Sequence, residues 1–97
     1  MLNVYTFHAD PGHGWLEVPL ADMIDVGLAP WDVSKYSYVD PRTRTFFLEE
    51  DCDAPVFMRA YSQKYGRDPR FDVRHTDRDA RCRSLPRNVD WEILATA

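Results

Sequence analysis

The chain has 97 residues, of which 44% are hydrophobic and 13% aromatic, and its formal charge is −4. This length allows a single domain over residues 1–97, and the composition excludes wholesale disorder. No stretch reaches the roughly 18 uncharged apolar residues of a membrane helix. The first ten residues lack a basic segment followed by an apolar run, so we expect no secretory signal and a cytoplasmic location.

The first half of the chain is predicted to form two strand pairs around a short helix. Polar and apolar residues alternate over 2–7 and 14–18, which predicts two strands joined by an Asp-Pro-Gly turn. A helix begins at Pro19, where the missing N–H does no harm. Its apolar stripe consists of Leu20, Met23 and Ile24. Residues 36–39 and 45–49 repeat the strand alternation and predict a second hairpin.

The second half is predicted to contain a longer helix and a last strand. Asp53 is a good N-cap, and Gly66 ends the helical periodicity. Residues 70–75 alternate again, with Phe71 and Val73 expected to point inward.

The order of elements defines the predicted fold class. Strand, strand, helix, strand, strand, helix, strand with short connections predicts an α+β domain, with a mainly antiparallel sheet of about five strands and both helices on one face. The tail from about residue 76 is predicted to be irregular. Five apolar residues give that tail some anchorage: Leu85, Val89, Trp91, Ile93 and Leu94.

Charge is unevenly distributed along the chain. Residues 1–56 hold ten acids and three bases, a net of −7, whereas residues 57–97 hold six acids and nine bases, a net of +3. The densest acidic run comprises Glu49, Glu50, Asp51 and Asp53. Exposed together, these carboxylates would imitate the phosphates of a duplex and bind a basic groove. The possible extensions of this patch are Asp22, Asp25 and Asp32. The alternative is local, because acids stabilise a helix N-terminus.

Seven arginines form a second charge feature over residues 67–87. They could contact phosphates, but four aspartates interleave with them and leave a net of only +3. A solvated, self-neutralised face is therefore the main interpretation, and direct nucleic-acid binding is not expected.

Metal and catalytic signals are sparse. His8, Asp10 and His13 bring metal-ligand types close together across a turn. No zinc spacing, nucleophile motif or phosphate loop accompanies them, so we predict no cofactor and no enzymatic activity. Cys52 and Cys82 are too few for a disulfide scaffold.

Aromatic side chains provide further candidates for a protein interface. Trp31 lies in a predicted connection, and Tyr36 and Tyr38 share one face of a predicted strand. Tyr and Trp often anchor interfaces, although they also complete small cores.

Three segments carry a family resemblance: His13-Gly14-Trp15-Leu16-Glu17-Val18, Tyr36-Ser37-Tyr38-Val39 and Leu48-Glu49-Glu50-Asp51-Cys52-Asp53-Ala54. In these stretches the chain resembles small uncharacterised proteins carried by bacteriophages, prophages and conjugative plasmids. The resemblance implies a place among mobile-element products, many of which antagonise host immunity, including anti-CRISPR and DNA-mimicking antirestriction proteins.

Three functions follow as hypotheses. The leading one is a non-enzymatic inhibitor that occupies the nucleic-acid site of a host defence complex, such as a CRISPR effector, through the acidic patch. The second is a nucleic-acid-binding accessory protein that uses the Arg-rich part. The third is a small metal-dependent hydrolase that uses His8, Asp10 and His13.

Overall fold

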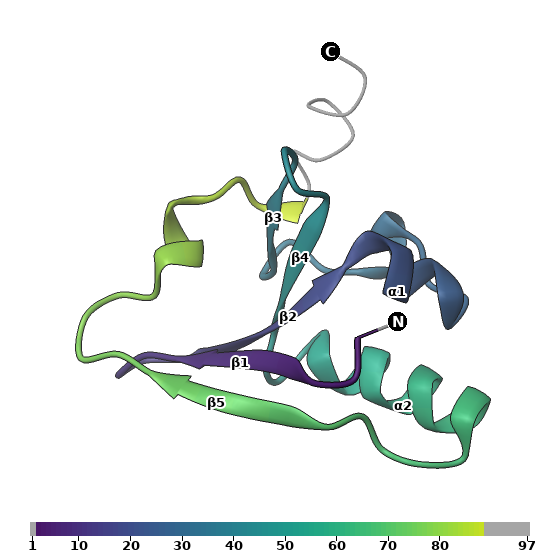
Figure 1. Ribbon diagram of the computed structural model, residues 1–97. Helices are drawn as coiled ribbons and strands as arrows, with labels where there is room; N and C mark the ends of the chain where they lie inside the picture. Colours follow the sequence, from purple (N-terminus) through teal and green to yellow (C-terminus); the bar gives the residue numbers. More distant parts are fainter. Residues whose placement is uncertain (1, 89–97) are drawn as a thin grey trace.

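The computed structural model describes residues 2–88 and shows a five-stranded sheet with two helices (Figure 1). The strand order is β3-β4-β2-β1-β5. The strands are β1 (Tyr5–Ala9), β2 (Gly14–Pro19), β3 (Tyr38–Asp40), β4 (Thr45–Glu49) and β5 (Phe71–His75). Neighbouring strands are antiparallel except β1 and β5, which are parallel. The predicted α+β class is confirmed, and the sheet is mixed although mostly antiparallel.

The β1–β2 hairpin shows why alternating residues form this sheet. Phe7 lies opposite Leu16, so the apolar side chains of both strands share one face. A larger residue in place of Gly14 would force the Phe7 ring to shift, because a Cβ atom at this position would lie 2.3 Å from Phe7 Cζ. The predicted strand over 2–7 is shifted in the structure, since β1 begins at Tyr5 and extends to Ala9.

The main core lies between this face and the helices α1 (Leu20–Asp25) and α2 (Ala54–Tyr65). Tyr5 packs edge-on against Phe57, with ring centroids 5.3 Å apart. From α1, Met23 is fully buried in the same core, whereas Ile24 is 61% exposed. The predicted position of Ile24 in a buried stripe is therefore wrong, because this six-residue helix turns the side chain outward.

The last strand also differs from prediction. Phe71 and Val73 were expected to point inward, yet they are 42% and 48% exposed. The reason is topological, because β5 is the outermost strand of the sheet.

The opposite face of the sheet is covered by residues 76–88, which include the 3-10 helix η2 (Arg81–Ser84). Ala80 and Cys82 pack there against Trp15 and Tyr38 as a second, smaller core. The other 3-10 helix, η1 (Pro30–Asp32), connects α1 to β3. The tail residues Val89, Trp91, Ile93 and Leu94 lie outside the described residues. No described helix is long and apolar enough to cross a membrane.

Candidate functional site

Two chain reversals meet at one end of the sheet and shape a hollow. The Glu50 N–H donates to the Gly14 carbonyl at 3.0 Å, which ties the start of β2 to the connection between β4 and α2. A hollow of about 280 Å³ opens beside this junction. Its lining residues are His13, Trp15, Tyr36, Tyr38, Glu49, Asp51, Cys52, Arg83 and Arg87.

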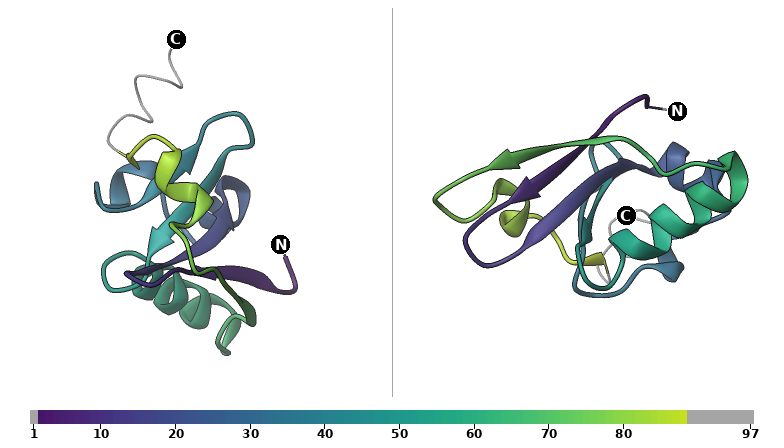
Figure 2. Two further views of the ribbon diagram at one scale, coloured as in Figure 1. Left: turned by 90° about the vertical axis from the view of Figure 1, so that its left-hand side faces the viewer. Right: turned by 90° about the horizontal axis from the view of Figure 1, so that it is seen from below.

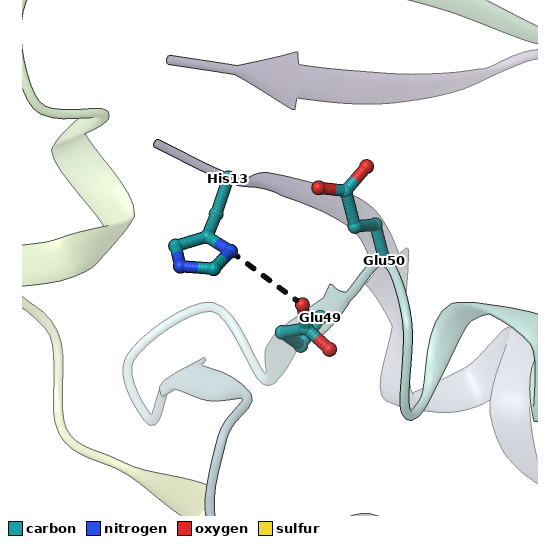
Figure 3. Close-up of side chains that lie close together, drawn as sticks. All are labelled: His13, Glu49 and Glu50. Carbon is teal, nitrogen blue, oxygen red and sulfur yellow. Dashed lines mark ion pairs between the residues drawn. The ribbon is translucent and has the colours of Figure 1, made fainter. Parts of the chain in front are cut away.

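Glu49 is an acidic residue of this hollow whose side chain is fixed by hydrogen bonds. The residue is only 8% exposed, and its Oε2 accepts the backbone N–H groups of Asp51 at 3.0 Å and Cys52 at 2.9 Å. Its Oε1 faces His13 Nδ1 at 3.9 Å, which is longer than a hydrogen bond (Figure 3). These contacts fix the carboxylate and shape the turn that leads into α2.

His13, Glu49 and Glu50 are the described residues best placed to hold a metal ion. One ligand atom from each lies within 4.8 Å of the others (Figure 3). Imidazole and carboxylate ligands of this kind suit Zn²⁺ and similar divalent cations. Sequence reasoning found His13 but missed the two glutamates as its companions, because they come from a strand end 36 and 37 positions along the chain.

The candidate metal ligands His8, Asp10 and His13 do not form a ligand group among the described residues. His8 Nε2 pairs with Glu17 Oε1 at 2.8 Å and lines a different hollow of about 610 Å³. Both Asp10 oxygens are occupied, since Arg83 donates Nε at 2.6 Å and Nη2 at 3.0 Å to them. These bonds from Arg83 hold the pKa of the Asp10 carboxyl well below its usual range.

Three residues of the predicted acidic patch are buried acceptors rather than surface charges. Besides Glu49, these are Asp22 and Asp53, each 5% exposed. Asp22 accepts the Tyr5 hydroxyl at 2.7 Å, and burial together with this bond raises the pKa of Tyr5. Asp53 accepts from the Ser34 backbone N–H at 3.0 Å, the Ser34 hydroxyl at 2.6 Å and the Ser37 hydroxyl. Asp53 is the N-cap residue of α2, but its side chain makes no capping bond.

The remaining predicted extensions of the patch, Asp25 and Asp32, also accept hydrogen bonds within the chain. Asp25 pairs with Lys64 Nζ at 2.9 Å and accepts the Tyr65 hydroxyl, and its pKa is lowered first by Tyr65 and then by Lys64. Asp32 accepts the Ala29 N–H at 2.8 Å. Glu50, Asp51 and Asp32 are exposed, and none of the ion pairs among the described residues involves them. Of these three, Glu50 and Asp51 lie beside the hollow. The prediction of one continuous acidic surface is therefore wrong, and two carboxylates of it remain available beside the hollow.

Of the three predicted aromatic anchors, two are exposed and one is buried. Trp31 is 76% exposed and Tyr36 is 52% exposed, whereas Tyr38 is buried. The Arg87 guanidinium lies 4.5 Å from the centroid of the Tyr38 ring. The turn before β3 takes Tyr36 out of the strand, so it does not share a strand face with Tyr38.

A second arginine stack was not visible in the sequence. The Arg83 guanidinium lies 4.7 Å from the centroid of the Trp15 ring, and Trp15 is 2% exposed. The Trp15 Nε1 has no hydrogen-bond partner in the described part of the chain. Sequence spacing cannot show such a stack, because the two residues are far apart along the chain.

Both cysteines are free thiols, and neither is activated. The Glu49 carboxylate beside Cys52 raises the pKa of that thiol, and burial raises the pKa of Cys82 to about 12. A thiolate nucleophile is therefore disfavoured at neutral pH at both positions.

No family model, no curated protein and no solved structure matches the chain.

Proposed function

We propose that the chain is a non-enzymatic protein that binds a basic partner protein stoichiometrically at the hollow beside Glu49. The observation that carries this proposal is the rim of that hollow. The exposed ring of Tyr36 and the exposed carboxylate of Asp51 border it, and the nearly buried Glu49 lies within it. An aromatic ring beside carboxylates suits a guanidinium group of a partner.

The charge of the hollow supports the same partner chemistry. Arg83 is neutralised by Asp10, which leaves Arg87 as the other cation among the arginines and lysines that line the hollow with Glu49 and Asp51. Glu50 adds a further exposed carboxylate next to His13. The local balance is therefore acidic, and it favours an incoming arginine or lysine over an anion.

The partner class is a host defence complex, with a CRISPR effector as the leading candidate. Nucleic-acid grooves of such complexes are rich in Arg and Lys because they must neutralise phosphates. A small protein anchored on one of those side chains would exclude the nucleic acid. The resemblance to products of mobile genetic elements supports this class. The mechanism differs from the predicted imitation of a row of phosphates, because Asp22, Glu49 and Asp53 are buried.

The test compares three forms of the tagged full-length chain. These are wild type, Glu50→Lys with Asp51→Lys, and the matched control Asp77→Lys with Asp79→Lys, which makes the same charge change at exposed positions outside the hollow. Each form is assayed for capture of a purified CRISPR effector and for relief of plasmid interference in cells. Wild type and control should bind and inhibit, and the Glu50/Asp51 form should lose both by at least about tenfold.

Two results would overturn the proposal. One is inhibition that survives the Glu50/Asp51 double substitution in a folded protein. The other is retardation of duplex or single-stranded DNA by the chain alone at low salt, which would favour the Arg-rich nucleic-acid hypothesis instead.

A further inference from the structure

The outer edge of β5 is an unused pairing edge. β5 is last in the strand order, pairs only with β1 within the described residues, and is exposed along its whole length (Figure 2, right view). An exposed strand of this kind is a template for pairing with another chain unless proline, a bulge or repelling charges protect it. Residues 71–75 contain no proline, and their two charges have opposite signs: Asp72 and Arg74.

The hydrogen bonds to β1 reveal which backbone groups of β5 point outward. Tyr5 N–H donates to the Arg70 carbonyl, and Thr76 N–H donates to the Ala9 carbonyl, both at 2.9 Å. In a parallel ladder, alternate residues of a strand direct both polar groups to the same neighbour. The even-numbered residues of β5 therefore face β1, which leaves the N–H and C=O groups of Phe71, Val73 and His75 on the outer edge.

We propose that β5 pairs antiparallel with β5 of a second copy of this chain about a two-fold axis at Val73. In this register Val73 exchanges both backbone bonds with the partner's Val73, and Phe71 exchanges them with the partner's His75. Asp72 then lies opposite the partner's Arg74 as a non-hydrogen-bonded pair, the kind in which facing side chains come closest. The two-fold symmetry makes this ion pair occur twice.

Charge selects this register over its neighbours. A two-fold axis at Asp72 or at Arg74 would place like charges opposite each other, and it would use backbone groups already bonded to β1. An axis at Phe71 would put Val73 opposite Pro69, which has no N–H to donate. The Val73 register alone among these satisfies the outward backbone groups and the charges together.

Pairing in this register would also bury two exposed apolar side chains. Phe71 and Val73 are 42% and 48% exposed and lie on the same sheet face as Tyr5 and Phe7, their partners across β1. Pairing would place Val73 against its own copy and Phe71 against the His75 side chain, which removes apolar surface from water. This inference does not depend on the proposed function, because the hollow lies at a different part of the sheet.

The test uses sedimentation equilibrium of the full-length chain up to about 1 mM, since a short strand pair gives modest affinity. Wild type should show a monomer–dimer equilibrium. Asp72→Arg and Arg74→Asp should each weaken it about tenfold, because two attractive pairs become repulsive. An equal mixture of these two variants should associate again, and so should the double swap Asp72→Arg with Arg74→Asp. The control Arg59→Asp, on the exposed side of α2, should leave dimerisation unchanged.

Different outcomes would contradict the dimer, the surface it uses or the strand register. A wild-type chain that stays monomeric up to this concentration overturns the proposal. Dimers that neither single variant weakens must use another surface, and weakened dimers that neither mixing nor the double swap restores must use another register. Circular dichroism of each variant establishes folding, which is expected to survive because Asp72 and Arg74 are exposed.

Discussion

Asp10 joins two parts of the chain that are distant in sequence, and its replacement is the sharpest test of the fold. Its side chain is 1% exposed. Oδ1 accepts the backbone N–H groups of Gly12 and His13, both at 2.9 Å. Oδ2 accepts the Ala80 N–H at 2.9 Å, and Arg83 bridges both oxygens. The β1–β2 turn is thereby fastened to the segment that covers the second face of the sheet.

We predict that Asp10→Asn lowers the free energy of unfolding by about 3 kcal/mol. The amide keeps its oxygen for the turn and for Arg83 Nη2, but it offers an NH₂ group to the Ala80 N–H and to Arg83 Nε, so those two bonds are lost. Hydrogen bonds to a charged group contribute about 1.5–3 kcal/mol each. The Arg83 side chain is 29% exposed, so water replaces part of what it loses, and the sum is reduced accordingly.

Urea unfolding followed by tryptophan fluorescence measures this effect. With a slope of about 1.5 kcal/mol/M, the midpoint should fall by about 2 M. The control is Asp40→Asn, whose Oδ1 accepts only the Arg42 N–H at 3.0 Å in an exposed turn, and which should cost less than about 0.5 kcal/mol. Equal midpoints for the two variants would refute the role assigned to Asp10.

Further predictions concern pH, the core and the backbone. Because the folded-state pKa of Asp10 is lowered, its stabilisation is complete above the unfolded pKa of about 3.9 and is lost as the pH falls further; urea midpoints between pH 5 and pH 2 should decline more steeply for wild type than for Asp10→Asn. Phe57→Ala, at a fully buried position, should cost about 3–5 kcal/mol in the same assay. Ser37→Ala removes a donor to buried Asp53 and the acceptor of the Glu49 N–H, so it should cost about 2 kcal/mol. Gly66→Ala should cost about 1 kcal/mol by thermal unfolding, because φ is 71° and the added methyl meets nothing within 4 Å.

The fold was predictable where a local period decides it. In β2, Leu16 and Val18 lie on the core face, and in β4 Phe46 and Leu48 do the same, as alternation predicts. The parallel pairing of β5 with β1 could not be predicted in this way, because its partners are separated by 66 positions. The exposure of Phe71 and Val73 follows from that placement at the sheet edge and not from their own sequence.

The site was less predictable, because burial of a charge depends on distant donors. Asp53 was singled out as a helix cap or a surface acid, yet Ser34 and Ser37 hold it from 19 and 16 positions away. A dense run of acids therefore indicates where carboxylates are, but not which of them meet water. Only the donors identify Glu50 and Asp51 as the exposed pair.

The hydrogen bonds of Asp10 support both the fold and the hollow. A substitution can therefore weaken partner capture in two ways, by lowering stability or by changing the hollow itself. Arg83 and Arg87 come from the segment that Asp10 fastens, whereas Glu50 and Asp51 come from the turn beyond β4. Loss of Asp10 should therefore weaken partner capture together with stability, and a lower temperature or an added osmolyte should restore both. Reversal of the charges at Glu50 and Asp51 should weaken capture at unchanged stability, and neither condition should restore it. A loss of capture that tracks stability in both variants would mean that the hollow is a structural junction and that the partner binds elsewhere.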